Sequence, residues 1–199
     1  MNILTATAIL TFGIIALTVK TGFAQGRTKK LRSFEVSNIV NASVDSVWKI
    51  MVDNFGDVAA YTPNIHHSHC TTDSTIVGVG TERLCTFNQK GNKYLREEIE
   101  FMDKDNYHFR VKFNTITQPL NTDLSRVHIY LSPLSPGQTK VRILMDYRTK
   151  PAFVGGLAKG KFINIFEDVL LGLKHYTETG ERVNAGTGNF GKIKRQYQR

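Results

Sequence analysis

An acidic residue in an otherwise apolar strand is the first feature of this sequence that could do chemistry. Glu97 lies in the stretch 94–102, and the other residues that would share its face of a strand, Leu95, Ile99 and Phe101, are apolar. A carboxylate placed among apolar side chains needs a cation, bound water or a proton to offset its lost hydration. We therefore expect Glu97 either to anchor a hydroxyl or carbonyl group of a ligand, with Tyr147 as a second anchor, or to form a structural ion pair with a base such as Arg83.

A short histidine-rich segment is the second chemical feature. His67 and His69 would share one face of a strand, with His66 and Cys70 beside them, and this spacing is compatible with two metal ligands. A third ligand at a suitable distance is not evident. We expect these side chains to be exposed or capping, and we expect no metal site.

The two cysteines, Cys70 and Cys85, flank a tight-turn sequence at 78–80. Strands on either side of this turn would pair and place the thiols roughly opposite each other. The cysteines could form a disulfide in an oxidising compartment, or remain two half-buried free thiols. No CxxC motif, catalytic triad or glycine-rich phosphate loop occurs, so we expect neither a redox motif nor a cofactor.

Periodicity predicts the elements that would position these residues. A strand over 33–41 precedes a helix over 44–54, for which Ser43 is a suitable N-cap. From 65 to 150 the apolar period is two, and turn residues separate six strands at 66–77, 81–88, 94–102, 107–116, 124–133 and 138–149. Hairpin spacing predicts an antiparallel sheet. After Pro151 the period returns to 3.6, which predicts a helix that ends near Glu181 and packs on the sheet.

Several short segments resemble a known superfamily in their order along the chain. They are 39–48 (IVNASVDSVW), 55–57 (FGD), 63–65 (PNI), 77–83 (VGVGTER), 96–99 (REEI) and 170–176 (LLGLKHY). The sequence resembles the START/Bet v 1-like superfamily, also called SRPBCC, and within it the polyketide cyclase/dehydrase and lipid-transport type. The resemblance covers nearly all of 33–185. It implies an α+β helix-grip fold, in which a curved antiparallel sheet of about seven strands wraps around a long C-terminal helix and encloses a cavity.

Strand and helix phase predicts which residues line that cavity. Odd-numbered residues are the apolar set in the strands over 94–102, 107–116 and 138–149. In 124–133 we also prefer the apolar odd-numbered set, although Arg126, His128 and Tyr130 could line a wetter pocket. The predicted ligand-binding residues are Leu95, Glu97, Ile99, Phe101, Phe109, Val111, Phe113, Met145, Tyr147, Phe166, Val169 and Leu173.

The expected function is binding, or transport, of a small hydrophobic molecule or lipid in the cavity. An alternative is a polyketide cyclase, aromatase or dehydratase-like enzyme that uses a pocket carboxylate, with Glu97, Tyr147 or His128 as the acid or base. The sequence shows no second, matched group, so catalysis stays open and no catalytic residue is assigned. A third alternative is an interior filled by its own phenylalanines.

The resemblance also extends to Glu97, whose position is similar to that of a pocket glutamate in plant hormone receptors of the superfamily. The segments 89–92 and 118–121 occupy the places of the closing loops of these receptors, but their residues do not match the gate motifs. A hormone-receptor role is therefore unsupported. Both segments remain candidates for a pocket rim.

The net charge of +9 lies in the two ends of the chain. Residues 1–32 and 186–199 hold nine of the 26 bases and no acid, so the 17 remaining bases balance the 17 acids. We therefore expect no nucleic-acid groove, although the basic tails could contact a membrane surface. The expected parts are a signal or anchor at 1–24, a basic linker at 25–32, the ligand-binding domain at 33–185 and a basic disordered tail at 186–199. The sequence does not indicate an oligomeric state.

The first residues resemble an export signal. Residues 3–19 are uncharged and mostly apolar, and Gly22 and Ala24 are small residues before a potential cleavage point. We expect a cleaved signal and an exported protein, periplasmic or secreted. Because bases follow the apolar run and none precedes it, an uncleaved membrane anchor over 3–19 is the alternative.

Overall fold

The computed structural model describes residues 31–73 and 76–198. The predicted signal or anchor at 1–24 and nearly all of the basic linker lie outside these residues. None of the helices within 31–73 and 76–198 has both the length and the apolar character needed to cross a bilayer.

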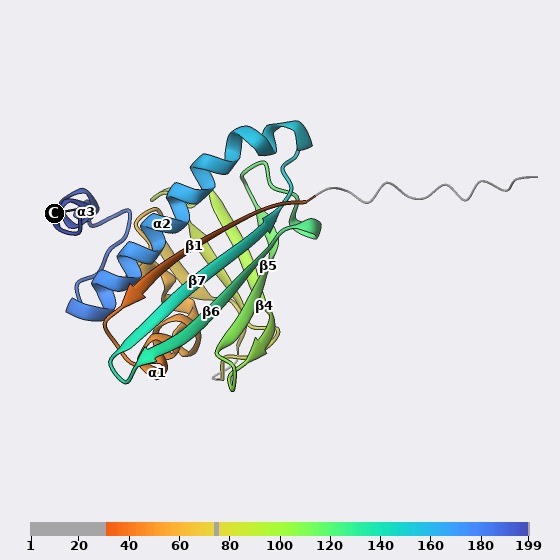
Figure 1. The fold of residues 1–199 in the computed structure, drawn as a ribbon. Helices are drawn as coiled ribbons and strands as arrows, with labels where there is room; N and C mark the ends of the chain where they lie inside the picture. The colour runs from red at the N-terminus through yellow and green to blue at the C-terminus, as the bar shows by residue number, and fades with distance from the viewer. Residues whose placement is uncertain (1–30, 74–75, 199) are drawn as a thin grey trace, which may run out of the picture.

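A single curved sheet of seven strands forms most of the domain (Figure 1). Its order is β1-β7-β6-β5-β4-β3-β2, and every neighbouring pair is antiparallel. The first strand thus closes against the last, while the other strands follow one another as hairpins. The strands are β1 (Arg32–Val40), β2 (His67–Cys70), β3 (Glu82–Thr86), β4 (Tyr94–Asp103), β5 (His108–Ile116), β6 (Arg126–Ser135) and β7 (Gln138–Tyr147).

The long helix α2 (Gly155–Thr179) crosses the open side of this sheet, and Leu170 and Leu173 are buried in the shared core (Figure 1). The helix ends where Gly180 adopts a left-handed conformation with φ of 74°. The sheet and α2 together confirm the predicted α+β helix-grip architecture.

The other helices within 31–73 and 76–198 are short. They are α1 (Val44–Trp48), its π-helical continuation η1 (Lys49–Asp53), the 3-10 turns η2 (Phe55–Ala60), η3 (Thr122–Leu124) and η4 (Ala152–Val154), and α3 (Phe190–Gln196).

Local sequence explains how the segment before β2 is fixed. The predicted N-cap is confirmed, because the Ser43 hydroxyl accepts a hydrogen bond from the Ser46 N–H. The end of η2 lies so close to α2 that a Cβ at Gly172 would collide with the Tyr61 carbonyl. Glycine at this helix position therefore lets Tyr61 reach the space between α2 and the sheet.

The predicted strand phase is confirmed in β5, β6 and β7, where the odd-numbered residues from Phe109 to Phe113, Val127 to Leu131 and Val141 to Tyr147 are buried. The phase is wrong at Phe101, whose side chain is 37% exposed. The register of β4 against β5 shifts between Ile99 and Phe101. This irregularity turns Phe101 to the outer face, where its ring centroid lies 5.0 Å from that of His108.

The C-terminal segment also differs from the prediction of a disordered tail at 186–199. It contains α3, in which Ile193 is buried, and Val183, just before this segment, is also buried. The Val183 N–H donates to the Ala60 carbonyl at 2.8 Å, and Lys194 Nζ lies 2.6 Å from Asp168 Oδ1 on α2. A few apolar anchors within a basic composition are sufficient to fold this segment back onto the domain.

Candidate ligand-binding cavity

A cavity of about 710 Å³ lies between the sheet and α2. Most of its lining is apolar, and Phe109, Phe113 and Phe166 contribute to the walls without filling the interior. The alternative of an interior packed solid by phenylalanines is therefore wrong. The volume falls in the range of small-molecule sites in proteins.

Most of the predicted lining residues do face this space. Eight of the predicted side chains line it: Leu95, Glu97, Phe109, Val111, Phe113, Met145, Phe166 and Val169. Four do not. Ile99 and Leu173 are fully buried in the packed core, and Phe101 is on the outer face of the sheet. The Tyr147 hydroxyl donates to the Gly155 carbonyl at 2.7 Å, so it fixes the first turn of α2, and the prediction of Tyr147 as a second anchor is wrong.

A buried ion pair forms the polar part of the cavity wall. Arg83 and Glu97 are only 8% and 7% exposed, and both line the cavity. Arg83 Nε donates to Glu97 Oε1 at 2.7 Å, and Nη2 lies 2.6 Å from the same oxygen. Arg83 Nη1 donates to the Phe55 carbonyl at 2.8 Å, and the guanidinium stacks 3.9 Å above the Phe55 ring. The predicted pairing of Glu97 with Arg83 is thus confirmed.

The pair leaves hydrogen-bonding capacity toward the cavity. Glu97 Oε2 accepts no hydrogen bond from any residue within 31–73 and 76–198, so this oxygen can accept one from a ligand. Burial is the largest single influence and lowers the pKa of Arg83, but the charge of Glu97, with smaller contributions from Cys85 and Tyr61 and the hydrogen bond to Glu97, together raise it above its usual value. The guanidinium therefore remains charged, and the pair is available to a ligand as a neutral dipolar group.

Tyr61 lies at the cavity wall next to this pair and was not singled out by the sequence. Burial raises the pKa of Tyr61 to about 12, while the charge of Arg83 opposes the shift. The phenol is therefore protonated at neutral pH and can donate a hydrogen bond. Its neighbour Thr62 also lines the cavity, and the buried Thr62 hydroxyl has no hydrogen-bond partner in the described part of the chain. Both residues come from an irregular segment with no alternation, so no pattern in the sequence could have assigned them.

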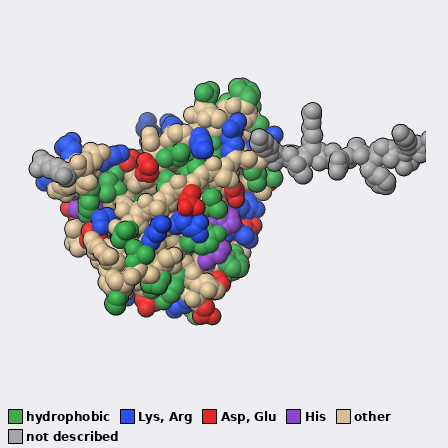
Figure 2. All heavy atoms as spheres, viewed as in Figure 1, with side chains coloured by type: hydrophobic (Ala, Val, Ile, Leu, Met, Phe, Trp, Pro, Cys, Tyr) green, Lys and Arg blue, Asp and Glu red, His purple; other side chains and the backbone are tan. Residues whose placement is uncertain are grey.

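The opening of the cavity is marked by lining residues that are also exposed. These are Gln118 and Pro119, after β5, and Leu157 and Lys161, in the first turns of α2. The predicted rim at 118–121 is therefore present, whereas no residue of 89–92 lines the cavity. In Figure 2 green hydrophobic and blue basic side chains gather together at the end of the molecule where α2 begins.

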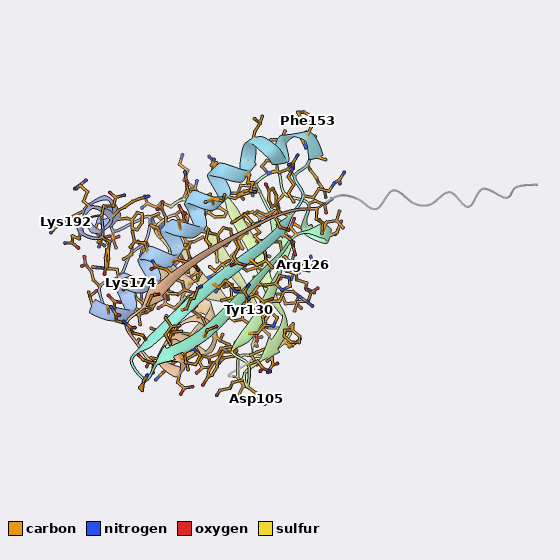
Figure 3. All side chains as sticks on the ribbon, in the orientation of Figure 1. Asp105, Arg126, Tyr130, Phe153, Lys174 and Lys192 are labelled. Atoms are coloured by element: carbon orange, nitrogen blue, oxygen red, sulfur yellow. The ribbon has the colours of Figure 1, made fainter. Side chains whose placement is uncertain are left out.

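The other predicted chemical groups lie away from the cavity. His67 and His69 are exposed on β2 with ring centroids 5.5 Å apart, and within 31–73 and 76–198 no three His, Cys, Asp or Glu side chains gather in a metal-binding arrangement. His128 stacks with His108 and Tyr130 on the outer face of the sheet, where Figure 3 labels Tyr130. Of the three acid–base candidates only Glu97 therefore reaches the cavity.

Both cysteines are free thiols in this structure. The register of β2 and β3 places Cys70 opposite Arg83 and Cys85 opposite Ser68, so the two cysteines are offset by two residues. Cys85 lines the cavity, and burial raises the pKa of its thiol to about 12. Cys85 is therefore a small apolar wall residue at neutral pH.

Comparison with solved structures identifies the fold. No family model and no curated protein matches the sequence. Ara h 8.0201 matches with a TM-score of 0.56 at 17% identity over 75% of this chain and 99% of that chain. The aromatase/cyclase Zhui from Streptomyces sp. R1128 matches with a TM-score of 0.58 at 11% identity over 77% and 100%. The di-domain ARO/CYC BexL matches with a TM-score of 0.60 at 20% identity over 74% of this chain and 46% of BexL, so this chain spans about half of that protein. The fold is the Bet v 1-like helix-grip fold that the sequence predicts, the fold also of polyketide cyclases.

Proposed function

We propose that this protein binds a small hydrophobic molecule or lipid in the cavity between the sheet and α2, and that Tyr61, Arg83 and Glu97 hold its polar group. The observation that carries the proposal is a cavity of about 710 Å³ with apolar walls and one buried polar cluster. Side chains that face a void lose dispersion contacts, and a guest molecule restores them. This arrangement of apolar surface with a few polar groups is typical of ligand sites.

The chemistry of the cluster favours a neutral oxygen on the ligand. Tyr61 and Thr62 supply hydroxyl groups, and Arg83 supplies N–H donors, while Glu97 already balances the guanidinium charge. A carbonyl or hydroxyl oxygen can accept from these donors without bringing a second negative charge close to Glu97. We therefore propose an apolar ligand that has a carbonyl or hydroxyl group at one position.

Native mass spectrometry of protein purified without detergent tests the proposal. We expect a mass increment from one bound small molecule, which is lost on denaturation and can be identified in an organic extract. Binding of a fluorescent fatty acid to delipidated protein is the second readout. Protein that purifies free of any small molecule and binds no member of a fluorescent fatty-acid panel would contradict the proposal.

A cyclase-like or dehydratase-like activity is the second candidate, and Tyr61 is the observation that favours it. A phenol with its pKa raised to about 12 beside Arg83 can donate to a substrate carbonyl as negative charge develops on its oxygen. Two of the similar solved structures are described as aromatase/cyclases. Turnover of a poly-β-ketone substrate that is lost in Tyr61→Phe would support this activity, whereas binding without turnover supports the ligand carrier.

A further inference from the structure

The end of the domain where α2 begins exposes large apolar side chains. Phe153, in η4, is 79% exposed, and Leu157, four residues later, is 85% exposed. Figure 3 shows Phe153 projecting from the tip of the molecule, away from the sheet. Four-residue spacing places the two side chains near each other on one turn, and paired exposed side chains of this size mark an interaction site more often than scattered single ones do. We call residues 150–161 the tip.

The tip and its surroundings are basic. No acid occurs between Asp146 and Glu167, whereas Lys150, Lys159 and Lys161 are all exposed in this interval. The neighbouring loop contributes one exposed acid, Asp123. Exposed apolar side chains among lysines form a surface that is complementary to anionic headgroups over hydrocarbon.

A second hollow lies directly beside Phe153. It has a volume of about 280 Å³ and is lined by Arg32, Arg148, Ala152 and Phe153. Arg32 and Arg148 therefore add two further basic residues to the surroundings of Phe153. This site is separate from the main cavity, with which it shares no lining residue.

The first strand, β1, begins at this same end of the domain. Arg32 pairs with Tyr147 at the start of β1, and its side chain packs against the first turn of α2. The sequence just before it supplies Arg27, Lys29 and Lys30. Cleavage after Ala24 would leave these bases in the chain.

We propose that the tip docks on an anionic bilayer, with Phe153 and Leu157 inserted at the level of the headgroups and the surrounding bases on the lipid phosphates. Leu157 and Lys161 also line the cavity opening, so docking in this orientation turns the opening toward the membrane. The proposal concerns a surface of the domain and does not require the cavity to be occupied.

A local fluorescence probe tests docking in the full chain. The single native tryptophan, Trp48, is buried in the core, so Phe153→Trp adds one exposed reporter at the tip. Leu134→Trp, in the hairpin between β6 and β7 at the opposite end of β7, is the matched control. With vesicles of phosphatidylglycerol and brominated phosphatidylcholine, we expect quenching and a blue shift for the Phe153→Trp variant and neither for the Leu134→Trp variant. Combined substitution of Lys150, Lys159 and Lys161 by Gln should weaken the binding that produces this quenching by roughly 100-fold.

The control distinguishes docking from simple tethering through residues 3–19. Equal quenching of the tip reporter and the control reporter, or quenching of neither, would overturn the proposal. A blue shift of the tip reporter that depends on protein concentration in the absence of lipid would show that a second copy covers the tip, which also overturns it. Quenching confined to the tip reporter, dependent on anionic lipid and weakened by salt, is the expected result.

Discussion

Two glutamates three residues apart on β4 form arginine pairs on opposite faces of the sheet. Glu97 faces the cavity and pairs with Arg83, with both side chains almost fully buried. Glu100 faces outward, and its Oε2 accepts from Arg110 Nε and Arg126 Nε, each at 2.8 Å, in a partly exposed setting. Partial burial opposes ionisation of Glu100, but the hydrogen bond from Arg126 and then that from Arg110 hold its pKa below the usual value.

The difference between these glutamates lies in hydration. Exposed ion pairs keep most of their water and contribute little to stability. A buried pair gives up that water, and apolar residues of similar size often replace such pairs without loss of stability. The inner pair is therefore difficult to explain by folding alone, whereas a role in holding a ligand accounts for its position on the cavity wall.

Removal of Arg83 should produce the largest effect. Arg83→Met leaves the Glu97 carboxylate and the Phe55 carbonyl without their donor, so we expect a loss of about 3–5 kcal/mol in the free energy of unfolding. The double variant Arg83→Met/Glu97→Leu removes the stranded charge and should recover at least half of that loss. Denaturant unfolding measures both, and a double variant no more stable than the single one would argue against a desolvation cost.

Tyr61 should make stability depend on alkaline pH. Its folded pKa is raised to about 12 from 10.0, so the stabilisation from the neutral phenol is complete below pH 10 and is lost as pH rises through 12. We expect the parent protein to lose about 2 kcal/mol relative to Tyr61→Phe between pH 9 and pH 12. Urea unfolding at several pH values gives the difference. The titration of Cys85 affects both proteins equally and therefore cancels from the comparison. Parallel pH profiles would contradict the assigned environment.

Substitution of the inner glutamate should affect binding more than folding. Glu97→Gln keeps an oxygen that can accept from Arg83 but changes the charge offered to a ligand. We expect roughly tenfold weaker binding of the co-purifying molecule, about 1.4 kcal/mol, with a smaller change in unfolding free energy. Titration calorimetry and thermal unfolding measure the two effects. A stability loss above about 2 kcal/mol with unchanged affinity would assign Glu97 to a purely structural pair.

The same substitution on the outer face should have the smallest effect. Glu100→Gln is expected to lower stability by less than about 1 kcal/mol and to leave ligand affinity unchanged, because Arg110 and Arg126 remain hydrated. The loss should shrink further in high salt. An effect on binding as large as that of Glu97→Gln would remove the distinction between the two faces.

Sequence reasoning works in this protein where the chain is periodic. Two-residue alternation in β5, β6 and β7 identifies the walls of the cavity, and the order of elements identifies the helix-grip fold. It fails at Phe101, because a one-residue shift in strand register inverts the face of every later side chain. It also fails at Tyr61, which reaches the cavity from an irregular turn through the space left by Gly172.

Polar side chains show a second limit of sequence reasoning. Tyr147 has the strand phase of a cavity residue, but a nearby backbone carbonyl at Gly155 takes its hydroxyl group. The C-terminal segment is basic, yet Val183 and Ile193 anchor it. In both cases the outcome depends on specific contacts between segments, and composition and period carry no information about such contacts.

The central claim is that the interior holds open space for a guest molecule, and filling that space tests it most directly. Val111→Phe adds volume at the cavity wall, and Thr115→Phe adds the same ring on the outer side of the same strand. We expect Val111→Phe to bind a fluorescent fatty acid at least about tenfold more weakly than Thr115→Phe, with a melting temperature equal to or above that of the parent. Unchanged binding together with a destabilisation of about 1–3 kcal/mol, the effect of overpacking a filled core, would contradict the account.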